Sequence, residues 1–486
     1  MGILSNLEPK PVFRYFEEIC GIPHGSANTK EISDYLVSFA KEHGLKVIQD
    51  AVNNVVIWKE GTAGYEEAAP VMMQGHIDMV CEKEEGCCID FMKEGVRLQL
   101  QDGVISAQGT TLGGDDGIAV AYMLAILSST DIPHPPLEAV FTVDEEIGML
   151  GASALDASVL KARTMLNIDS EDEGYLLVSC AGGVSAVLQI PVQRQMAEGQ
   201  LVTLTVTGLQ GGHSGVEIDK GRGNANQILG RILYELDKRY SCKLCAVSGG
   251  LKDNAIPRTA EAKLLFEQSD QGQIEDFMAD VKDLSEILKR EYQRTDPDVE
   301  LVVEPGQGVD TLPVMTADTG KKVIAALVCL PGGIQRMSAD VEGLVQTSLN
   351  LGILVTDDDE VRFSFAVRSS VETEKQELVN RILCLAGALG GTVSCKGEYP
   401  AWEYRQDSPL REKMVEVFEE QYGRKPVVQA IHAGVECGLF AGKLPGLDCV
   451  SYGPDMKDIH TPNESMDVES VRRTWDYTLE VLKRLR

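Results

Sequence analysis

The chain has 486 residues, too many for one ordinary hydrophobic core, so two or three domains are expected. Its formal net charge of −30 argues against nucleic acid or an anionic membrane surface as a partner. No apolar run is long enough to cross a membrane, and the first residues, MGILSNLEPK, lack the pattern of a secretory signal. Twelve cysteines without paired zinc-finger spacing are typical of reduced, buried thiols, so we expect a cytoplasmic protein.

From residue 9 to about 185, helical and strand patterns alternate along the chain. Helices are predicted at 10–22, 29–44 and 117–129, and strands at 46–59, 70–80, 137–146 and 164–172. Such alternation is typical of an α/β domain with a mainly parallel sheet flanked by helices. Ligands of these domains bind beyond the carboxyl ends of the strands.

After about residue 185 the pattern changes to two runs that each read helix, strand, strand, helix, strand. The first run spans 222–304 and the second 319–397, which suggests a duplication of topology. From about residue 400 the α/β pattern returns, with helices at 408–422 and 435–443 and strands at 425–433 and 447–454. We therefore predict an α/β domain in two parts, 1–185 and 400–486, with an inserted α+β domain at 186–399.

Carboxylates and histidines follow the predicted strands of the α/β domain. They are His76 and Asp78 in GHIDMV, Asp115 and Asp116 in TTLGGDDGIA, Glu145 and Glu146 in VDEEIGMLGA, Asp169 in NIDSED, and His460 in GPDMKDIHTPNE. Taken singly, each could be a helix cap or a solvated loop residue. Together they converge on the sheet edge where such folds build sites. Histidine and carboxylate ligands without cysteine suit a divalent metal such as zinc, manganese or cobalt.

Other kinds of site explain these residues less well. A phosphate loop would need a GK[ST] ending after TTLGGDDGI, and two carboxylates would repel phosphate. A serine triad lacks the G-x-S-x-G turn, and a glycosidase would leave both histidines unexplained.

The six motifs GHIDMV, GTTLGGDDGIA, VDEEIGMLGA, NIDSED, GLQGGHSG and GPDMKDIHTPNE, taken in order, resemble those of the dizinc metallopeptidase family of aminoacylases, glutamate carboxypeptidases and dipeptidases. The segments NAIPR and SADVEGLVQTSLNLG favour its dipeptidase branch. The resemblance implies that His76, Asp115 and Asp169 hold one metal and that Asp115, Glu146 and His460 hold the other. The charge balance agrees with this set, because three carboxylates and a bridging hydroxide offset two divalent cations. The metals are expected to be zinc, with cobalt or manganese as alternatives.

The resemblance also implies roles for other residues. Glu145 would be the general base that activates a water between the two metals, and Asp78 would accept the second N–H of His76. His213 would stabilise the oxyanion. Arg368 would bind the terminal carboxylate of the substrate, although it could equally be a surface strand residue. His432 and Glu436 in HAGVECGLF would lie near the site, where Glu436 either meets a substrate amine or caps a helix. The family further implies a cis peptide between Asp115 and Asp116.

The implied activity is hydrolysis of unblocked dipeptides, including Xaa-His dipeptides. The inserted domain would act as a lid and form a homodimer, with His213 serving either its own chain or a partner. The alternatives are an aminoacylase or a tripeptidase on the same scaffold, or a metal-binding scaffold without catalysis. The presence of Glu145 beside all five ligands speaks against a scaffold, which has no use for a base.

Overall fold

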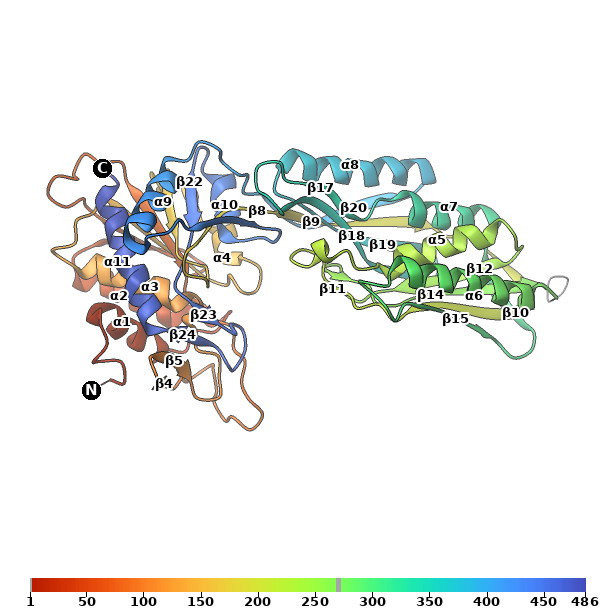
Figure 1. Cartoon of the computed structure of the whole chain (residues 1–486), viewed down its shortest axis with the longest axis horizontal. Helices are drawn as coiled ribbons and strands as arrows, with labels where there is room; N and C mark the ends of the chain where they lie inside the picture. The colour runs from red at the N-terminus through yellow and green to blue at the C-terminus, as the bar shows by residue number, and fades with distance from the viewer. Residues whose placement is uncertain (1, 268–271) are drawn as a thin grey trace. The chain divides into compact units, whose positions relative to one another are not determined.

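The computed structural model describes residues 2–267 and 272–486, which form two compact units (Figure 1). Unit 1 comprises Met1–Cys180, Tyr404–Ala430 and Val435–Arg486, and unit 2 comprises Ala181–Glu403 and Ile431–Gly434. The predicted inserted segment, 186–399, lies within unit 2. Residues 431–434 also belong to unit 2, although the sequence pattern placed them in the α/β domain.

Unit 1 is built on an eight-stranded sheet of order β1-β2-β6-β3-β7-β22-β8-β21. Its strands are β1 (Lys46–Gln49), β2 (Val55–Lys59), β3 (Val71–His76), β6 (Leu137–Thr142), β7 (Thr164–Asn167), β8 (Tyr175–Cys180), β21 (Val427–Ile431) and β22 (Asp448–Ser451). Its helices are α1 (Lys10–Cys20), α2 (Lys30–Glu42), α3 (Gly114–Ser128), α4 (Leu150–Ala154), η1 (Ala157–Val159), α9 (Pro409–Tyr422), α10 (Glu436–Lys443) and α11 (Val468–Arg484).

The four central strands of this sheet, β6, β3, β7 and β22, are parallel. Every residue of β3 and β6 is buried, as expected for strands covered on both faces. Helix α3 is apolar around its whole circumference and is also buried, so it fills the core rather than covering it. The predicted α/β class is therefore confirmed. The segment 46–59 forms two strands, because residues 50–54 turn the chain back into an antiparallel hairpin.

A separate four-stranded sheet of unit 1 was not predicted. It has the order β23-β24-β5-β4, with β4 (Leu98–Gln101), β5 (Val104–Ala107), β23 (Met456–Lys457) and β24 (Ser465–Asp467). It pairs the segment after β3 with the segment that carries His460, so two parts of the chain far apart in sequence lie side by side.

Unit 2 is an α+β unit with a ten-stranded sheet, whose main order is β15-β10-β14-β12-β18-β19-β9-β20. The strands of unit 2 are β9 (Gly182–Pro191), β10 (Arg194–Thr207), β11 (Gly212–His213), β12 (Lys243–Gly249), β13 (Ala255–Ile256), β14 (Ala260–Glu267), β15 (Glu300–Pro305), β16 (Asp310–Met315), β17 (Gly333–Met337), β18 (Val345–Thr356), β19 (Glu360–Ser369) and β20 (Thr392–Tyr399). Of these, β11 and β13 form a separate two-stranded sheet. Its helices are η2 (Ile218–Lys220), α5 (Ala225–Asp237), α6 (Ile274–Glu291), α7 (Ala317–Cys329) and α8 (Glu372–Leu389).

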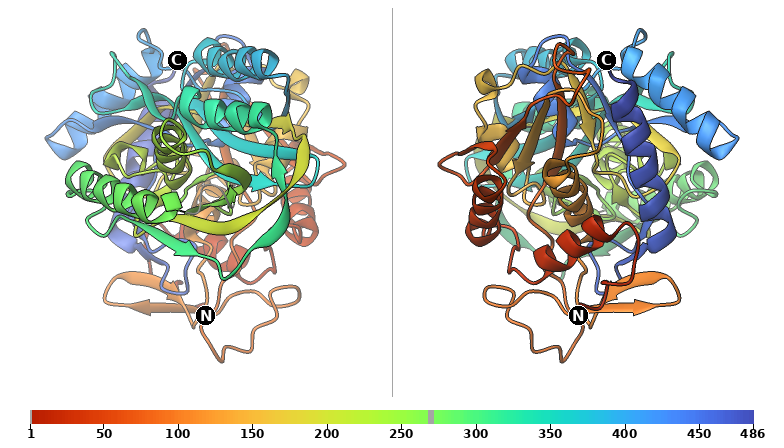
Figure 2. Two further views of the ribbon diagram at one scale, coloured as in Figure 1. Left: turned by 90° about the vertical axis from the view of Figure 1, so that its right-hand side faces the viewer. Right: turned by 90° about the vertical axis from the view of Figure 1, so that its left-hand side faces the viewer.

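Alternate residues of the unit 2 strands pack under its four long helices. Val202, Leu204 and Val206 of β10 share one apolar core with α5, α6, α7 and α8, whereas Leu201 faces a small second cluster. The structure also contains both predicted runs. One is α5, β12, β14, α6, β15 and the other is α7, β18, β19, α8, β20, and the two meet where β12 pairs with β18. The left view of Figure 2 shows the helices of unit 2 in green to teal.

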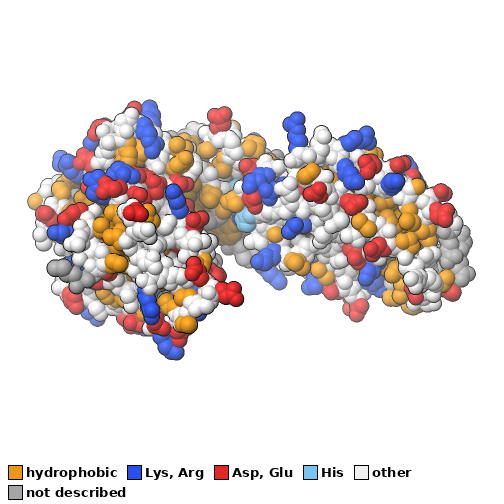
Figure 3. Space-filling model, turned by 60° about the horizontal axis from the view of Figure 1, so that its bottom comes forward, with side chains coloured by type: hydrophobic (Ala, Val, Ile, Leu, Met, Phe, Trp, Pro, Cys, Tyr) orange, Lys and Arg blue, Asp and Glu red, His pale blue; other side chains and the backbone are white. Residues whose placement is uncertain are grey.

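The surface carries its acidity in a dispersed form. On the face shown in Figure 3, Asp and Glu side chains are interspersed with Lys and Arg on both units. All twelve cysteines are described and none forms a disulfide, but only five are buried and five are exposed. The expectation of generally buried thiols is therefore wrong. Among the described residues, no helix is both long and apolar enough to cross a membrane.

Candidate metal centre

Three of the five predicted ligands, His76, Glu146 and Asp169, lie at the carboxyl ends of parallel strands of unit 1. His76 is the last residue of β3, and Glu145 and Glu146 follow the end of β6. Asp169 follows the end of β7, whereas His460 lies between β23 and β24 of the four-stranded sheet. Parallel strands present these ends at one edge of the sheet, so residues distant in sequence converge there.

Asp115 joins the two histidines of this group. Its Oδ1 lies 3.1 Å from His76 Nε2 and its Oδ2 lies 3.2 Å from His460 Nε2. Asp169 Oδ1 is 3.8 Å from His76 Nε2, and Glu146 Oε1 is 2.9 Å from His460 Nε2. All five predicted ligands therefore come together, with one oxygen of Asp115 directed to each histidine. The Asp115–Asp116 peptide is cis, which confirms that prediction.

Asp116 is a further acidic residue at this site. Its Oδ2 accepts the backbone N–H of His76 at 3.2 Å, and its Oδ1 is buried without a hydrogen-bond partner among the described residues. Ligand atoms of His76, Asp116 and Asp169 lie within 4.8 Å of one another, as do those of Asp115, Glu146 and His460. A side chain at Gly75 would collide with Asp116 Oδ2 at 2.4 Å, which explains the glycine of the GHIDMV motif.

The pKa values of the clustered carboxylates and histidines indicate that this site is suited to bind cations. Burial raises the pKa of Asp169 to about 8, and the neighbouring Asp115 and Glu436 act in the same direction. Burial also raises the pKa of Glu145 to about 9. Hydrogen bonds to Asp115 and Glu146 raise the pKa of His460 to about 10. Crowded carboxylates, imidazole ligands and an orphaned buried oxygen on Asp116 fit a pair of divalent cations.

The turn after β6 brings both glutamates to the site. Because β6 ends at Thr142 and Asp144 has a φ of 54°, the backbone changes direction immediately before Glu145. Ligand atoms of His76, Glu145 and Glu146 accordingly lie within 4.8 Å of one another. Successive residues could not share a site within a regular strand.

Asp78 contacts more of this site than the sequence suggested. Strand β3 ends at His76, and the His76 Nδ1 lies 3.0 Å from the main-chain carbonyl of Asp78 but 3.6 Å from its carboxylate. The sequence led us to expect the Asp78 carboxylate as the partner of His76 Nδ1, but the Asp78 main-chain carbonyl lies closer to that nitrogen. The carboxylate accepts the backbone N–H of Glu145 at 3.1 Å and of Glu146 at 3.4 Å. Asp78 therefore holds the turn that carries both glutamates.

Glu436 lies in a buried polar network that links the central strands of unit 1. Its Oε2 accepts hydrogen bonds from Gln74 Nε2 at 2.5 Å and from Thr142 Oγ1 at 2.7 Å. Its Oε1 is buried without a hydrogen-bond partner among the described residues. Helix α10 begins at Glu436 with no side-chain cap, so the helix-cap interpretation is wrong. Burial raises the pKa of Glu436 to about 7.

His213, Arg368 and His432 lie together in unit 2. The Nδ1 of His213 accepts the backbone N–H groups of Gly215 and Val216 at 3.1 and 3.2 Å, so its Nε2 carries the proton and can donate. Burial and the charge of Arg368 lower the pKa of His213 and keep it neutral. A side chain at Gly215 would meet the carbonyl of His432 at 2.5 Å, so the glycine lets these two loops approach.

Arg368 and His432 are buried and only partly paired. Arg368 is 9% exposed, so its interpretation as a surface residue is wrong, and its Nη1 donates to the Tyr399 hydroxyl at 2.8 Å. The Nε2 of His432 lies 2.7 Å from Ser348 Oγ. Arg368 Nε and His432 Nδ1 are buried without hydrogen-bond partners among the described residues. Burial first, and then the Arg368 charge, lowers the pKa of His432 to about 3.

Comparison with known proteins identifies the family. The profile of the peptidase family M20/M25/M40 matches residues 72–484, which include all five predicted ligands. The chain belongs to this peptidase family.

This peptidase is similar over its whole length to two proteins. It is 35% identical to the cytosol non-specific dipeptidase of Escherichia coli, over 100% of this chain and 99% of that protein. It is 36% identical to the aminoacylhistidine dipeptidase of Vibrio alginolyticus, with a TM-score of 0.92 over 99% and 98% of the two chains. The aminopeptidase PepT of Bacillus cereus shares the fold at 16% identity, with a TM-score of 0.57 over 99% of each chain. Members of the family are metal-dependent, in agreement with the ligand groups in unit 1.

Three contacts of this peptidase escaped the sequence analysis. Ser26 Oγ donates to Asp78 Oδ2 at 2.8 Å, and the Ala27 N–H donates to Asp144 Oδ1 at 2.6 Å. Glu464 accepts backbone N–H groups from the loop that carries Asp115. Each joins segments distant in sequence, so local patterning gives no signal for it. Glu464 could have been noted only as an acidic residue four positions after His460.

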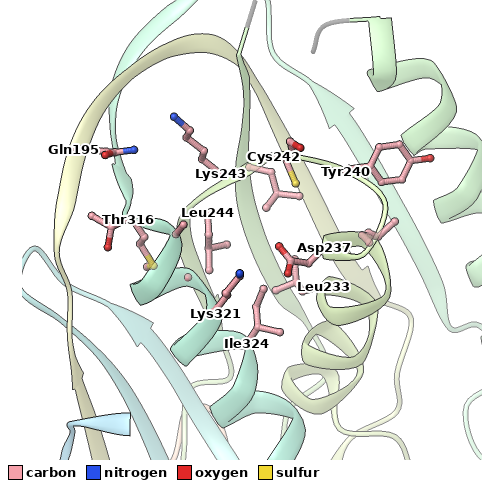
Figure 4. Close-up of a pocket in the computed structure, with 16 residues that line it drawn as sticks. Gln195, Leu233, Asp237, Tyr240, Cys242, Lys243, Leu244, Thr316, Lys321 and Ile324 are labelled. Atoms are coloured by element: carbon pink, nitrogen blue, oxygen red, sulfur yellow. The ribbon is translucent and has the colours of Figure 1, made fainter. Parts of the chain in front are cut away.

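A cavity of about 340 Å³ lies elsewhere in the peptidase, within unit 2 (Figure 4). Leu233, Asp237, Tyr240, Lys243 and Lys321 are among its lining residues. None of the predicted site residues lines it, so it is separate from the candidate metal centre.

Proposed function

We propose that this peptidase is a dipeptidase that hydrolyses unblocked dipeptides, including Xaa-His dipeptides. The main support for this proposal is the arrangement of the site. Asp115 directs one oxygen to His76 and the other to His460, and Glu145 lies beside them. The names of the two full-length relatives, both dipeptidases, support the same substrate class.

Two divalent cations, zinc before cobalt or manganese, are proposed as cofactors. His76, Asp115 and Asp169 would hold one, and Asp115, Glu146 and His460 the other. When bound, the cations would polarise the scissile carbonyl and increase the acidity of water. Of the two neighbouring glutamates, Glu146 has a proposed ligand role and Glu145 has none. Glu145 is therefore the proposed general base. It takes a proton from the attacking water and delivers it to the leaving amine.

The other polar groups are proposed to bind the ends of the substrate. His213 donates through Nε2 to the developing oxyanion, a role that suits a neutral imidazole with its Nδ1 already occupied. Arg368 and His432, each with an unsatisfied buried nitrogen, bind the terminal carboxylate. Glu436, with its unsatisfied Oε1, binds the free ammonium group. Asp78 positions His76 and the turn that carries the base.

We further propose that the protein acts in the cytoplasm as a homodimer formed through unit 2, with unit 2 as a lid, and that it uses neither nucleic acid nor a membrane as a partner. The decisive experiment measures hydrolysis of a dipeptide panel by the purified protein before and after chelation. Cleavage of free dipeptides that is lost with the metal and restored by zinc supports the proposal. Release of acetate from acetyl-amino acids without cleavage of dipeptides would identify an aminoacylase, and exclusive cleavage of tripeptides would identify a tripeptidase.

A further inference from the structure

The motif GPDMKDIHTPNE ends with an acidic residue, Glu464, that no role so far explains. Glu464 is buried, with 3% of its surface exposed. Its Oε2 accepts the backbone N–H groups of Leu112 at 2.7 Å and Gly113 at 3.2 Å. Its Oε1 accepts those of Gly114 at 2.8 Å and Asp115 at 3.4 Å. One carboxylate thus serves four successive amides.

These four amides belong to the loop that presents Asp115 to both histidines. The loop is buried, and buried N–H groups without an acceptor are costly. Gly113 has a φ of 72°, and a side chain at Gly114 would meet Glu464 Oε1 at 3.3 Å and Met456 Sδ at 3.1 Å. The paired glycines of the TTLGGDDGIA motif therefore let the backbone wrap closely around the carboxylate.

Glu464 is also tied to the other side of the centre. It follows His460 by four residues, and its own backbone N–H donates to the Thr461 carbonyl at 3.1 Å, which closes the intervening turn. His460 itself has a φ of 61°. The loops that carry Asp115 and His460 are therefore joined through a single side chain whose two oxygens are both engaged by amides.

We propose that Glu464 is a positioning residue for the metal position formed by Asp115, Glu146 and His460, an inference that rests on the proposed metal ligands. With both oxygens occupied by N–H groups, Glu464 does not act as a ligand. It fixes the relative placement of Asp115 and His460, two of the three ligands of that position. Residues that hold metal ligands in place typically contribute roughly 10- to 100-fold to metal affinity.

The test compares Glu464→Gln with a matched control, Glu138→Gln. Glu138 is also buried in unit 1 and accepts backbone N–H groups from Lys161 and Ala162 at 2.9 and 3.0 Å, but it lies at the start of β6, whereas the ligands follow the end of that strand. Metal-free protein is titrated with Zn²⁺ against a chromophoric chelator, and thermal unfolding is followed with and without Zn²⁺. The variant His460→Ala, which lacks a proposed ligand, shows how the zinc titration and the thermal unfolding change when one metal position is lost.

We expect Glu464→Gln to keep one ion near the affinity of the unsubstituted protein and to bind the other roughly 10- to 100-fold more weakly. It should therefore resemble His460→Ala, whereas Glu138→Gln should bind both ions normally. Two ions at unchanged affinity in Glu464→Gln, or equal losses in Glu464→Gln and Glu138→Gln, would overturn the inference. Should Glu464→Gln not fold, Glu464→Asp, which keeps the charge but is one methylene shorter, must show the same selective loss. Failure of the unsubstituted protein to bind two ions would instead overturn the metal centre itself, and this inference with it.

Discussion

Glu436 provides a direct test of how the enzyme recognises an unblocked substrate. In Glu436→Gln, the amide oxygen can still accept from Gln74 and Thr142, so the NH2 group takes the place of the unsatisfied Oε1. A donor would then face the proposed site of the substrate ammonium group. Loss of a hydrogen bond between charged groups costs about 1.5–3 kcal/mol. Because about 1.4 kcal/mol corresponds to a tenfold change in rate, kcat/KM for a free dipeptide should fall roughly 10- to 100-fold.

The assay compares each dipeptide with its des-amino analogue, which has the same side chains but no ammonium group. Glu436→Gln should lose activity on the dipeptide and little on the analogue, so that discrimination between the two collapses. Metal content and thermal unfolding are measured on the same samples, with Glu138→Gln as the control for substitution of a buried glutamate. An equal loss on both substrates, or a loss on neither, would refute the assignment of Glu436 to the substrate amine.

Further outcomes are expected from the proposed centre. Glu145→Ala should retain two metals by elemental analysis yet lose roughly 10²- to 10⁴-fold in kcat, and near-normal turnover would contradict its role as the base. Asp115→Ala should lose metal as well as activity, since that residue faces both histidines; retention of two ions would contradict its bridging position. The raised pKa of His460, about 10, means that a metal must displace its proton at neutral pH. Zinc affinity should therefore rise as pH rises toward 10. Calorimetry in two buffers would measure the protons released on binding. A zinc affinity independent of pH would argue against His460 as a ligand. Mixing inactive His213→Ala and Glu145→Ala proteins under subunit exchange should restore one working site per mixed dimer; no recovery despite exchange would show that His213 acts within its own chain.

Much of the site could be predicted because its residues lie where strand patterns end. His76, Glu145, Glu146 and Asp169 each follow a short apolar run, and parallel strands bring such ends together without further information. The cis peptide at Asp115 came from the family resemblance.

Other features could not be predicted, because they depend on contacts between distant segments. The period-two pattern of a strand placed Asp78 beside His76, but it could not show that β3 ends at His76 and that the Asp78 carboxylate turns toward the amides of Glu145 and Glu146. Likewise, no local pattern reveals that Glu464 meets amides about 350 positions earlier in the chain.

The assignment of residues 431–434 to unit 2 has a consequence for exchanging parts between related enzymes. The chain enters unit 2 twice, once for Ala181–Glu403 and once for Ile431–Gly434. The shorter segment, Ile431–Gly434, contains His432, whose Nε2 lies 2.7 Å from Ser348 Oγ in the longer segment. A chimaera that transplanted only 181–403 would place a foreign strand β18 against the resident His432. A graft that carries the whole of unit 2 therefore needs two inserts, the longer segment and residues 431–434.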